Sequence, residues 1–446
     1  MNSEQQYIEL YEANSGIICS NSPKAMNDCR NKAFDDFRKL GFPSKKVERY
    51  KYIDVPALFA PDYGVNLQRL EIPVNPKELF NCSVPKLSTL LYYVVNDSLF
   101  PTKETRALPD GVIIDSFRNA YENNIDFIGK YYNTLASTED DAITALNTML
   151  AQDGLLIFVP RNTKIDKTIQ VLNILNADVD LMANRRVMIV LEEGAQAQLL
   201  FCDHAIKNNA FLTTQVVEVF VGRNAHLDLY CLEETHIKNV RFSNLYIKQE
   251  ADSVVNHNQI TLHNGVTRNR TDLVFEGEGA ECQLNGCVIA DKKQFVDNNT
   301  LIDHRVGHCT SNELYKYVLN DEAVGAFAGR VLVRKDAQQT VSQETNQNLC
   351  ASQQARIFTQ PMLEIYADDV KCSHGSTVGQ LNDSALFYMR QRGIPEKEAR
   401  LLLEHAFVNE VIEKMEIEPL RDRLSHLVEM RFRGKLNICE GCKLCK

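Results

Sequence analysis

The sequence contains no tryptophan and no apolar run long enough to cross a membrane. A transmembrane helix needs roughly 20 consecutive apolar residues, whereas the best apolar stretches, 155–160 and 187–191, have the length of a β-strand. Basic residues are in the minority, with 49 Lys and Arg against 59 Asp and Glu. Phosphate backbones are bound by a concentrated basic face. We therefore expect no membrane and no nucleic acid as a partner, and a protein partner is favoured.

Motifs of common enzymes are also missing. The chain has no G-x-x-x-x-G-K-[ST] phosphate loop, no G-x-S-x-G motif and no H-E-x-x-H motif. The glycine-containing stretch 276–282 lacks the G-x-G-x-x-G spacing of a dinucleotide-binding loop. We therefore expect that the chain is not an enzyme by itself and that any ATP hydrolysis comes from another subunit.

Thirteen cysteines are spread over the 446 residues, many of them inside apolar, strand-like segments. This distribution is typical of reduced packing thiols and not of a disulfide framework. Residues 1–16 resemble neither a signal peptide, with its basic start and apolar core, nor an Arg- and Ser-rich transit peptide. We expect a cytoplasmic protein.

Hydrophobic periodicity divides the chain into four regions. A mostly helical region is predicted for 1–150, because amphipathic segments end there at Gly and Pro stop signals. In 151–383, β-branched or aliphatic residues alternate with polar ones in short runs, which is the pattern of strands. Helical spacing returns in 384–433, and a cysteine-rich tail occupies 434–446.

The strand-rich region favours a solenoid. Turn-like segments recur ahead of its strands, each with an alanine, and the first three gaps between these alanines are 26 to 30 residues: Ala195, Ala225, Ala251, Ala280 and Ala323. Such recurrence is typical of a β-solenoid, in which each coil packs its inward side chains on the previous coil. A sandwich or barrel is the main alternative, but the stretch of strands is long for either.

The densest group of reactive side chains lies in 367–379 and contains Asp368, Asp369, Cys372 and His374. In a strand, residues two apart point to the same face, so Cys372 and His374 would present a thiol and an imidazole together. Such a pair could hold iron or sulfur, because both groups are metal ligands and histidine can lower a neighbouring thiol's pKa. Spacing alone favours the plainer alternative of a packed cysteine beside a surface histidine.

Cys439, Cys442 and Cys445 form a C-x-x-C-x-x-C motif at the C-terminus. Three thiolates can wrap one metal ion, but a closed tetrahedral site needs a fourth ligand. A mobile, exposed thiol tail is an equal alternative.

Two further groups of polar residues are interpreted as structural. The first consists of stacked or turn residues of the solenoid: Asp303, His304, His308 and Cys309. The second consists of scattered histidines, one to a strand or loop, which are expected to be ordinary side chains with satisfied hydrogen bonds: His204, His226, His236, His257 and His263.

From about residue 25 to 415 the sequence resembles the SufB/SufD family of iron-sulfur cluster assembly scaffolds. The similar segments are 30–55, 145–174, 302–319 and 361–394, the last of which includes the motif CSHG. In that motif Gly375 follows the histidine where SufB-type sequences carry a glutamate, so the chain resembles the SufD type.

The resemblance implies a mainly β protein with a right-handed parallel β-helix core between helical terminal regions. It implies two partners, a SufB-like β-helix subunit and a SufC-like ABC-type ATPase. Cys372 and His374 would lie at the interface with the SufB-like subunit, where a transient, nascent iron-sulfur cluster forms. The ATPase would dock on the C-terminal helices, at Leu386, Phe387, Tyr388, Arg392, Gly393, Leu403 and Phe407. No family role extends to the tail, and flavin binding by the complex and a homodimer of the isolated chain stay open.

Two other functions are weighed against the assembly scaffold. A stand-alone β-helix enzyme could act on polysaccharides with Asp368 and Asp369 as acids. The absence of tryptophan platforms and of a secretion signal counts against it. A structural β-helix without cluster chemistry is the third possibility.

Overall fold

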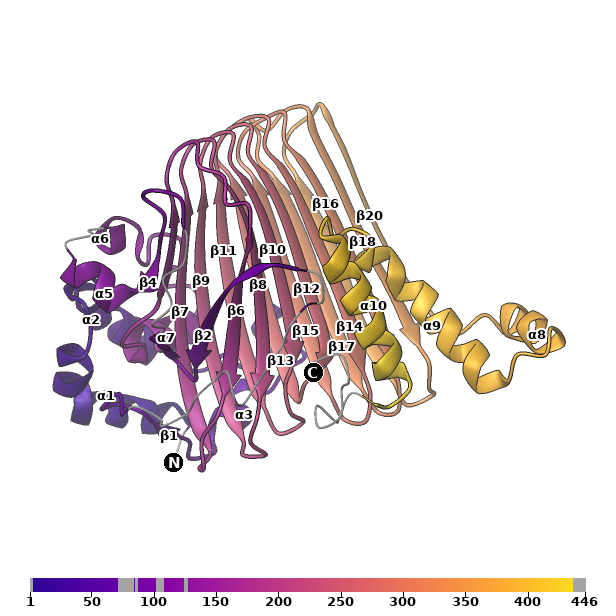
Figure 1. The fold of residues 1–446 in the computed structure, drawn as a ribbon, viewed down its shortest axis with the longest axis horizontal. Coiled ribbons are helices and arrows are strands. Elements are labelled where there is room, and N and C mark those ends of the chain that lie inside the picture. The colour runs from indigo at the N-terminus through magenta and orange to yellow at the C-terminus, as the bar shows by residue number, and fades with distance from the viewer. Residues whose placement is uncertain (1–2, 71–83, 85–86, 102–107, 124–126, 436–446) are drawn as a thin grey trace.

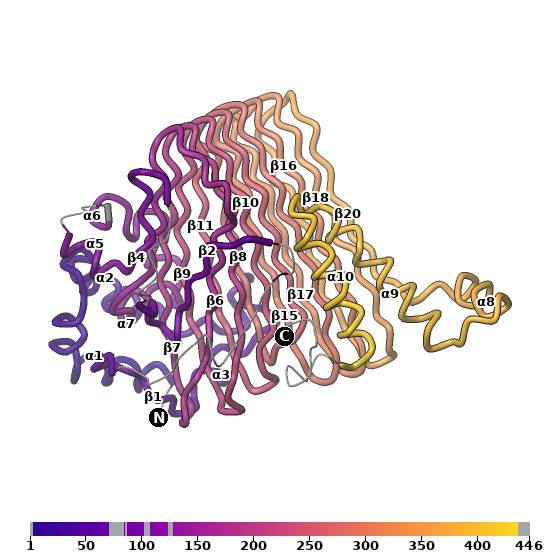
Figure 2. Tube along the Cα trace, viewed as in Figure 1, coloured from indigo at the N-terminus to yellow at the C-terminus, as the bar shows by residue number. Residues whose placement is uncertain are grey.

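Two parallel β-sheets face each other and form one solenoid, with helices at both ends of the chain (Figures 1 and 2). The computed structural model describes residues 3–70, 84, 87–101, 108–123 and 127–435. Successive strands of the core alternate between the two sheets, so that each pair of strands completes one coil. The prediction of a mainly β protein with a solenoid core and helical ends is confirmed.

The strands of each sheet follow one another along the solenoid. The first sheet contains, in chain order, β1 (Gly64–Val65), β4 (Ile113–Ser116), β5 (Leu155–Val159), β7 (Leu181–Leu191), β9 (Phe211–Val221), β11 (Val240–Gln249), β13 (Val266–Phe275), β15 (Phe295–His304), β17 (Val324–Val333) and β19 (Arg356–Ile365). The second contains β2 (Thr89–Val95), β3 (Ser98–Leu99), β6 (Thr168–Leu175), β8 (Gln196–Ala205), β10 (His226–Glu234), β12 (Val254–His263), β14 (Glu281–Ala290), β16 (Thr310–Leu319), β18 (Thr340–Cys350) and β20 (Val370–Gly379).

Both sheets begin within the N-terminal region. Strand β2 pairs in parallel with β6, and β4 pairs antiparallel with β5. The segment 89–95 shows no strand alternation because both of its faces are covered: Leu90 and Tyr92 face the core between the sheets, while Tyr93 packs on the opposite side. Residues 1–150 therefore supply strands to the solenoid as well as helices.

One turn of successive coils repeats a pair of residues that share backbone conformation and size. The first member of the pair has a left-handed backbone: Gly194, Asn224, Asp252, Gly279, His308 and Gln339. Glycine, Asn and Asp adopt this conformation at low cost. The second member is small and buried: Ala195, Ala225, Ser253, Ala280, Cys309 and Thr340.

Backbone hydrogen bonds connect the small residues of successive coils. The amide after each one donates to the carbonyl of the preceding small residue, as His226 N does to Ala195 O at 2.9 Å and Val254 N does to Ala225 O at 2.9 Å. Three of the alanines singled out in the sequence belong to this ladder. Ala251 lies in one of these turns, two residues before its small residue Ser253, and Ala323 lies in a turn on the other side of the coil. The alanine spacing that predicted the solenoid therefore matches the repeated small-residue position at only three of the five alanines.

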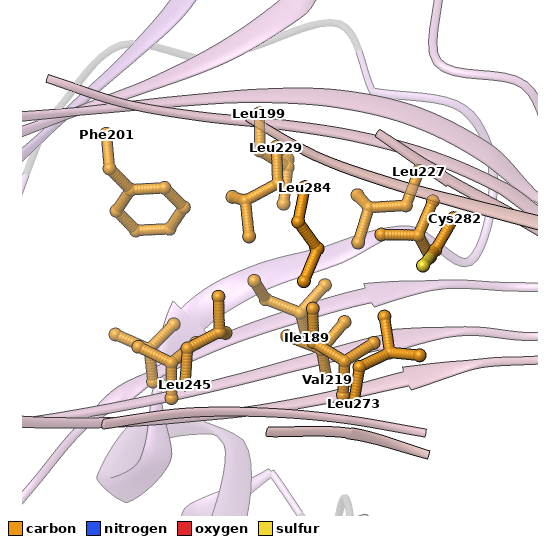
Figure 3. Packing of buried hydrophobic residues seen from close by; sticks show 14 of the residues in the cluster. Ile189, Leu199, Phe201, Val219, Leu227, Leu229, Leu245, Leu273, Cys282 and Leu284 are labelled. Atoms are coloured by element: carbon orange, nitrogen blue, oxygen red, sulfur yellow. The ribbon is translucent and has the colours of Figure 1, made fainter. Parts of the chain in front are cut away.

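Aliphatic side chains fill the space between the sheets. They come from inward positions of both sheets and interdigitate along the solenoid axis (Figure 3): Ile189, Leu199, Phe201, Val219, Leu227, Leu229, Leu245, Leu273, Cys282 and Leu284. At roughly 25 cal/mol per Å² of buried apolar surface, this continuous core is the main source of stability.

The outer face of the first sheet is covered by N-terminal helices: α1 (Ser3–Ser20), α2 (Lys24–Leu40), a 3-10 turn η1 (Glu48–Tyr50), α3 (Val55–Phe59), α5 (Phe117–Glu122), α6 (Phe127–Tyr131) and α7 (Ala142–Leu150). The outer face of the second sheet is covered by α9 (Glu396–Ile412) and α10 (Glu418–Phe432), while α8 (Asp383–Gln391) projects past the last coil (Figure 1). None of the helices in the described ranges combines the length and the apolar character that a membrane span requires.

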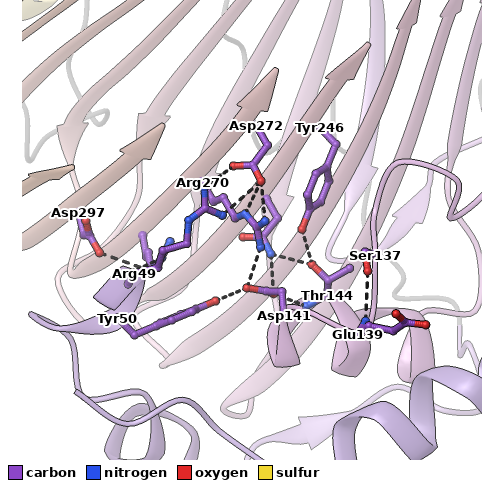
Figure 4. A network of polar contacts seen from close by, with 12 residues as sticks. Arg49, Tyr50, Ser137, Glu139, Asp141, Thr144, Tyr246, Arg270, Asp272 and Asp297 are labelled. Atoms are coloured by element: carbon purple, nitrogen blue, oxygen red, sulfur yellow. Dashed lines mark hydrogen bonds and ion pairs between the residues drawn. The ribbon is translucent and has the colours of Figure 1, made fainter. Parts of the chain in front are cut away.

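A buried ionic network joins the N-terminal region to the first sheet (Figure 4). Arg270 on β13 pairs with Asp141 at 3.1 Å and with Asp272 at 2.5 Å. Asp141 also accepts a hydrogen bond from the Tyr50 hydroxyl and caps α7 through the Thr144 amide at 2.7 Å. The arginines lower the pKa of the Asp141 carboxyl against the opposing effect of burial.

We expect Arg270→Ala to lower the free energy of unfolding by about 3 to 5 kcal/mol, because it leaves buried carboxylates without their cation. Arg305→Ala is the matched control, since Arg305 pairs with Glu276 and Asp303 but its side chain is 50% exposed. Such exposed pairs contribute about 0 to 1 kcal/mol. Denaturant unfolding of both variants measures the difference, and equal losses would contradict this role for Arg270.

Candidate functional site

The predicted thiol-imidazole pair lies on the last strand of the solenoid. Within the described residues, strand β20 pairs only with β18, and β19, the last strand of the first sheet, pairs only with β17. Both strands therefore have one edge whose amide and carbonyl groups receive no ladder bonds from a following coil. In Figure 1 this open end carries the β20 label.

The register of β20 on β18 decides where Cys372 and His374 point. Cys372 lies opposite Ser342, and His374 lies opposite Glu344. Ser342 and Glu344 are buried and face the space between the sheets. In a parallel pair, aligned residues share a face of the sheet. Cys372 and His374 therefore extend two rows of inward-facing side chains onto β20, in the last coil of the described solenoid.

The two side chains differ in their surroundings. Cys372 is half-buried against an apolar group of residues that includes Val331, Val333 and Leu363, whereas His374 is exposed. Burial raises the pKa of the Cys372 thiol, and only the Ser342 backbone acts in the opposite direction. A thiolate at Cys372 requires a bound cation or a positive group from elsewhere.

Two buried carboxyl groups lie directly behind His374, and sequence reasoning missed them. Glu344 and Glu313 are aligned on neighbouring coils, at 0% and 2% exposure, and the Thr300 hydroxyl neighbours the Glu313 carboxyl. The Glu344 carboxyl fits because Gly329 has no side chain; a Cβ there would lie 2.2 Å from Glu344 Oε1.

The surroundings of these two glutamates favour the neutral, protonated form. Burial raises the pKa of both carboxyls, and the nearby Glu313 raises that of Glu344 further. The signal in the sequence is the run 340–348, in which every inward-facing position is polar: Thr340, Ser342, Glu344, Asn346 and Asn348.

The open end also exposes apolar side chains. Five of them surround the last coil at exposures of 38 to 63%: Val341, Phe358, Ile365, Tyr366 and Val378. The Tyr52 ring stacks on Phe358 with centroids 4.4 Å apart, so the N-terminal region covers one corner of this surface. The hydroxyls of Thr359 and Ser376 bridge the two sheets at 2.7 Å.

The residues expected to dock an ATPase divide into two groups. Phe387 and Tyr388 are exposed by 62% and 58% on α8, and Arg392 donates a hydrogen bond to the Tyr388 hydroxyl at 2.8 Å. Gly393, with φ of 84°, ends this helix. In contrast, Leu386 is buried, Leu403 is half-buried, and Phe407 packs on the second sheet under Lys316.

The remaining sequence-based candidates occupy separate places. Cys439, Cys442 and Cys445 lie outside the described residues. Asp368 and Asp369 lie in an exposed turn before β20. His304 faces inward and contacts the Ser311 hydroxyl at 2.9 Å, Asp303 pairs with two surface arginines, and His308 and Cys309 form a turn pair.

The scattered histidines have ordinary polar contacts. His257 and His263 contact backbone carbonyls, His236 accepts a hydrogen bond from the Lys238 amide, and His204 lies 4.0 Å from Glu234. His226 contacts Asp228 at 3.1 Å.

We expect Glu344→Gln to stabilise the protein as the pH rises. The folded-state pKa of Glu344 is raised, so its contribution to stability is complete below the ordinary glutamate pKa of about 4.3 and declines at higher pH, where the unfolded chain ionises first. The neutral glutamine removes this decline. At pH 8 the free energy of unfolding of the variant should exceed that of the wild type by about 1 kcal/mol or more.

Thermal unfolding from acid to mildly alkaline pH measures this gain. Glu278→Gln, a change of the same kind at an exposed turn, is the control and should follow the wild-type profile. A constant difference between Glu344→Gln and the wild type at every pH would mean that Glu344 is ionised in the folded protein.

Two family profiles match the chain, and together they span nearly all of this architecture. The profile described as SUF system FeS cluster assembly, SufBD core domain, matches residues 173–407. The profile of the SufBD protein N-terminal region matches residues 1–171.

Individual proteins are similar over the same extent. The iron-sulfur cluster assembly protein SufD of Escherichia coli is 27% identical over 97% of both chains. An iron-sulfur cluster assembly SufBD family protein of Synechocystis is 28% identical over 90% of both chains. Protein ABCI7, chloroplastic, of Arabidopsis thaliana is 27% identical over 90% of this chain and 85% of its own.

Proposed function

The chain belongs to the SufBD family of iron-sulfur cluster assembly proteins, and on that premise we propose that it is a scaffold subunit without ATPase activity. It pairs with a SufB-like β-helix subunit and a SufC-like ABC-type ATPase, and the three together build and transfer nascent clusters. The observation that carries the proposal is the location of Cys372 and His374 on the uncovered last coil.

The open end supports pairing with a second β-helix. Two unpaired strand edges and an apolar rim are surfaces that monomeric proteins normally cover. A partner with the same kind of open end would cover both the strand edges and the apolar rim. Its edge strands would supply hydrogen bonds, and its rim would bury Val341 and Val378. The isolated chain could meet this need with a second copy of itself, as a homodimer.

The ligands at this end support iron as the cargo. Thiolate sulfur and imidazole nitrogen both bind iron, and iron-sulfur clusters are usually held by thiolates. Because burial raises the pKa of Cys372, the thiol gives up its proton when a cation binds in its place. Two side chains are too few to close a cluster site, so the partner supplies the other ligands and the cluster is transient.

The C-terminal helices support docking of the ATPase. Helix α8 extends past the solenoid, and the rings of Phe387 and Tyr388 are 62% and 58% exposed there. Arg392 lies over the Tyr388 ring, 5.1 Å from its centroid, and fixes its orientation. We place the ATPase contact on this part of α8 and on Leu402, which is exposed by 42% on α9.

We place the protein in a reducing compartment, the cytoplasm. The nine cysteines within the described residues are all free, and clusters with thiolate ligands require reduced thiols. The alternative of a polysaccharide-acting enzyme has no structural support, because Asp368 and Asp369 lie in an exposed turn.

We expect His374→Ala to lower cluster assembly by about tenfold, the scale of loss when the surroundings of a metal are altered. Iron and acid-labile sulfide, measured on the anaerobically purified, co-expressed complex, give the readout. His374 is exposed, so the substitution should leave folding and partner binding unchanged. His236→Ala is the control, and equal cluster content in both variants would remove His374 from the site.

We expect two substitutions to remove the two partners separately. Val378→Asp places a charge on the rim of the last coil and should release the β-helix partner while the ATPase stays bound. Phe387→Asp on α8 should do the opposite. Pull-down of the co-expressed complex measures both, and Val179→Asp is a matched control, because Val179 is 60% exposed in a turn far along the chain from the last coil.

The proposal fails if Val378→Asp leaves both partners bound, or if Phe387→Asp releases neither. Loss of both partners from either variant would mean that the two surfaces are not separate.

A further inference from the structure

Three metal-binding side chains converge at a second place, on the outer face of the second sheet. His226 and Asp228 begin β10 and share its outer face, and Glu416 lies in the connection between α9 and α10. The His226 Nε2 and Asp228 Oδ1 atoms are 3.1 Å apart, and one ligand atom from each of the three residues lies within 4.8 Å of the other two. The group joins the solenoid to the C-terminal helices.

The aspartate of this group is held in a defined orientation. Gln198 on β8 donates to Asp228 Oδ2 at 3.1 Å, and Asn256 on β12 donates to Asp228 Oδ1 at 2.8 Å. Both amides lie in register with Asp228 on the neighbouring strands. Hydrogen bonds from outer residues to a ligating carboxylate are the usual means of orienting it toward a metal ion.

The helical connection is held in place at the same point. The Glu416 amide donates to the Tyr230 hydroxyl at 3.3 Å, so the Glu416 backbone is tied to β10 itself. Asp228 is buried, His226 is half-buried and Glu416 is exposed. The group is therefore closed on the side of the sheet and open to solvent on the side of the helices, which gives an ion a route of access.

Charge at this group is unbalanced. Among the described residues no lysine or arginine forms an ion pair with Asp228 or Glu416, and His226 is the only basic side chain in contact. A buried carboxylate is costly unless it is paired with a cation or coordinates a metal. A divalent cation would neutralise both carboxylates at once.

We propose that His226, Asp228 and Glu416 bind one divalent first-row transition-metal ion, of which zinc is the representative. Zinc binds imidazole nitrogen and carboxylate oxygen at about 2.0 to 2.2 Å, so two such ligands in a tetrahedral site are about 3.4 Å apart. His226 Nε2 and Asp228 Oδ1, 3.1 Å apart, already lie near this spacing, and a Glu416 ligand atom lies within 4.8 Å of the ligand atoms of both residues. An imidazole ligand favours this class of metal over calcium or magnesium, which prefer oxygen alone.

The ion ties the α9–α10 corner to the solenoid and leaves a fourth position for water. The site is separate from the cluster surface, because β12, β14, β16 and β18 lie between β10 and β20 in the same sheet. The bound ion fixes the helices α9 and α10 on the second sheet, and this role does not depend on the proposed assembly function.

Cobalt(II) titration of the full-length, reduced protein tests the site. Cobalt replaces zinc and reports its ligands, since nitrogen and oxygen ligands give visible d–d absorption, whereas thiolates add charge-transfer bands. We expect one equivalent with d–d absorption and without thiolate charge transfer, displaced by zinc. His226→Ala should weaken binding at least tenfold, since even changes outside the ligand set cost about 10- to 100-fold. His236→Ala should bind as the wild type does.

Glu416→Gln provides the second variant, because Glu416 is exposed and its loss should not affect folding of the solenoid. It should also weaken cobalt binding at least tenfold. Zinc should raise the unfolding temperature of the wild type but not of either variant, since a ligand stabilises the state that binds it. The proposal is overturned if no cobalt binds with nitrogen and oxygen ligation, or if His226→Ala or Glu416→Gln binds it as tightly as the wild type.

Discussion

The in-register stacking of one coil on the next is the constraint on which the rest of this structure depends. Within the solenoid, backbone amides and carbonyls have no water to bond, so each coil must present its groups at the height of the coil before it. The turn pairs maintain this register: a left-handed residue reverses the chain, and a small buried residue such as Ala225 or Ser253 lets the next coil approach. A shift by one residue would turn every inward side chain outward.

The functional surface follows from the way this stacking ends. Every earlier coil covers the inward side chains of its predecessor, but no strand among the described residues follows β19 and β20. Cys372 and His374 are inward-facing residues of that last coil, and they are accessible for this reason. The polar row behind them, with Glu344 next to His374, continues the buried polar side chains, such as Arg241 and Asn269, that line part of the interior on earlier coils. Termination of the repeat thus leaves Cys372, His374 and two strand edges without a following coil in the described part of the chain.

The helices at the two ends of the chain attach by apolar contacts that ion pairs reinforce. The N-terminal region is joined to the first sheet by buried charges centred on Arg270 and Asp141 in addition to its apolar contacts. The C-terminal helices pack aliphatic residues such as Val408 on the second sheet, and Arg431 on α10 pairs with Asp291 at 2.6 Å. Helix α8 lies beyond both attachments, which leaves its aromatic residues free for another protein.

The sequence by itself determined the local features of this protein. Alternation with a period of two predicted the strands, and the spacing of Cys372 and His374 put them on one face. It could not show that the segment 89–95 is a strand, because burial on both faces removes the alternation. Tertiary structure decided which face is inward, which coil is last, that Glu344 lies behind His374 and that Glu416 meets His226. These depend on contacts between residues far apart in the chain, and short-range periodicity contains no information about which distant segments pair.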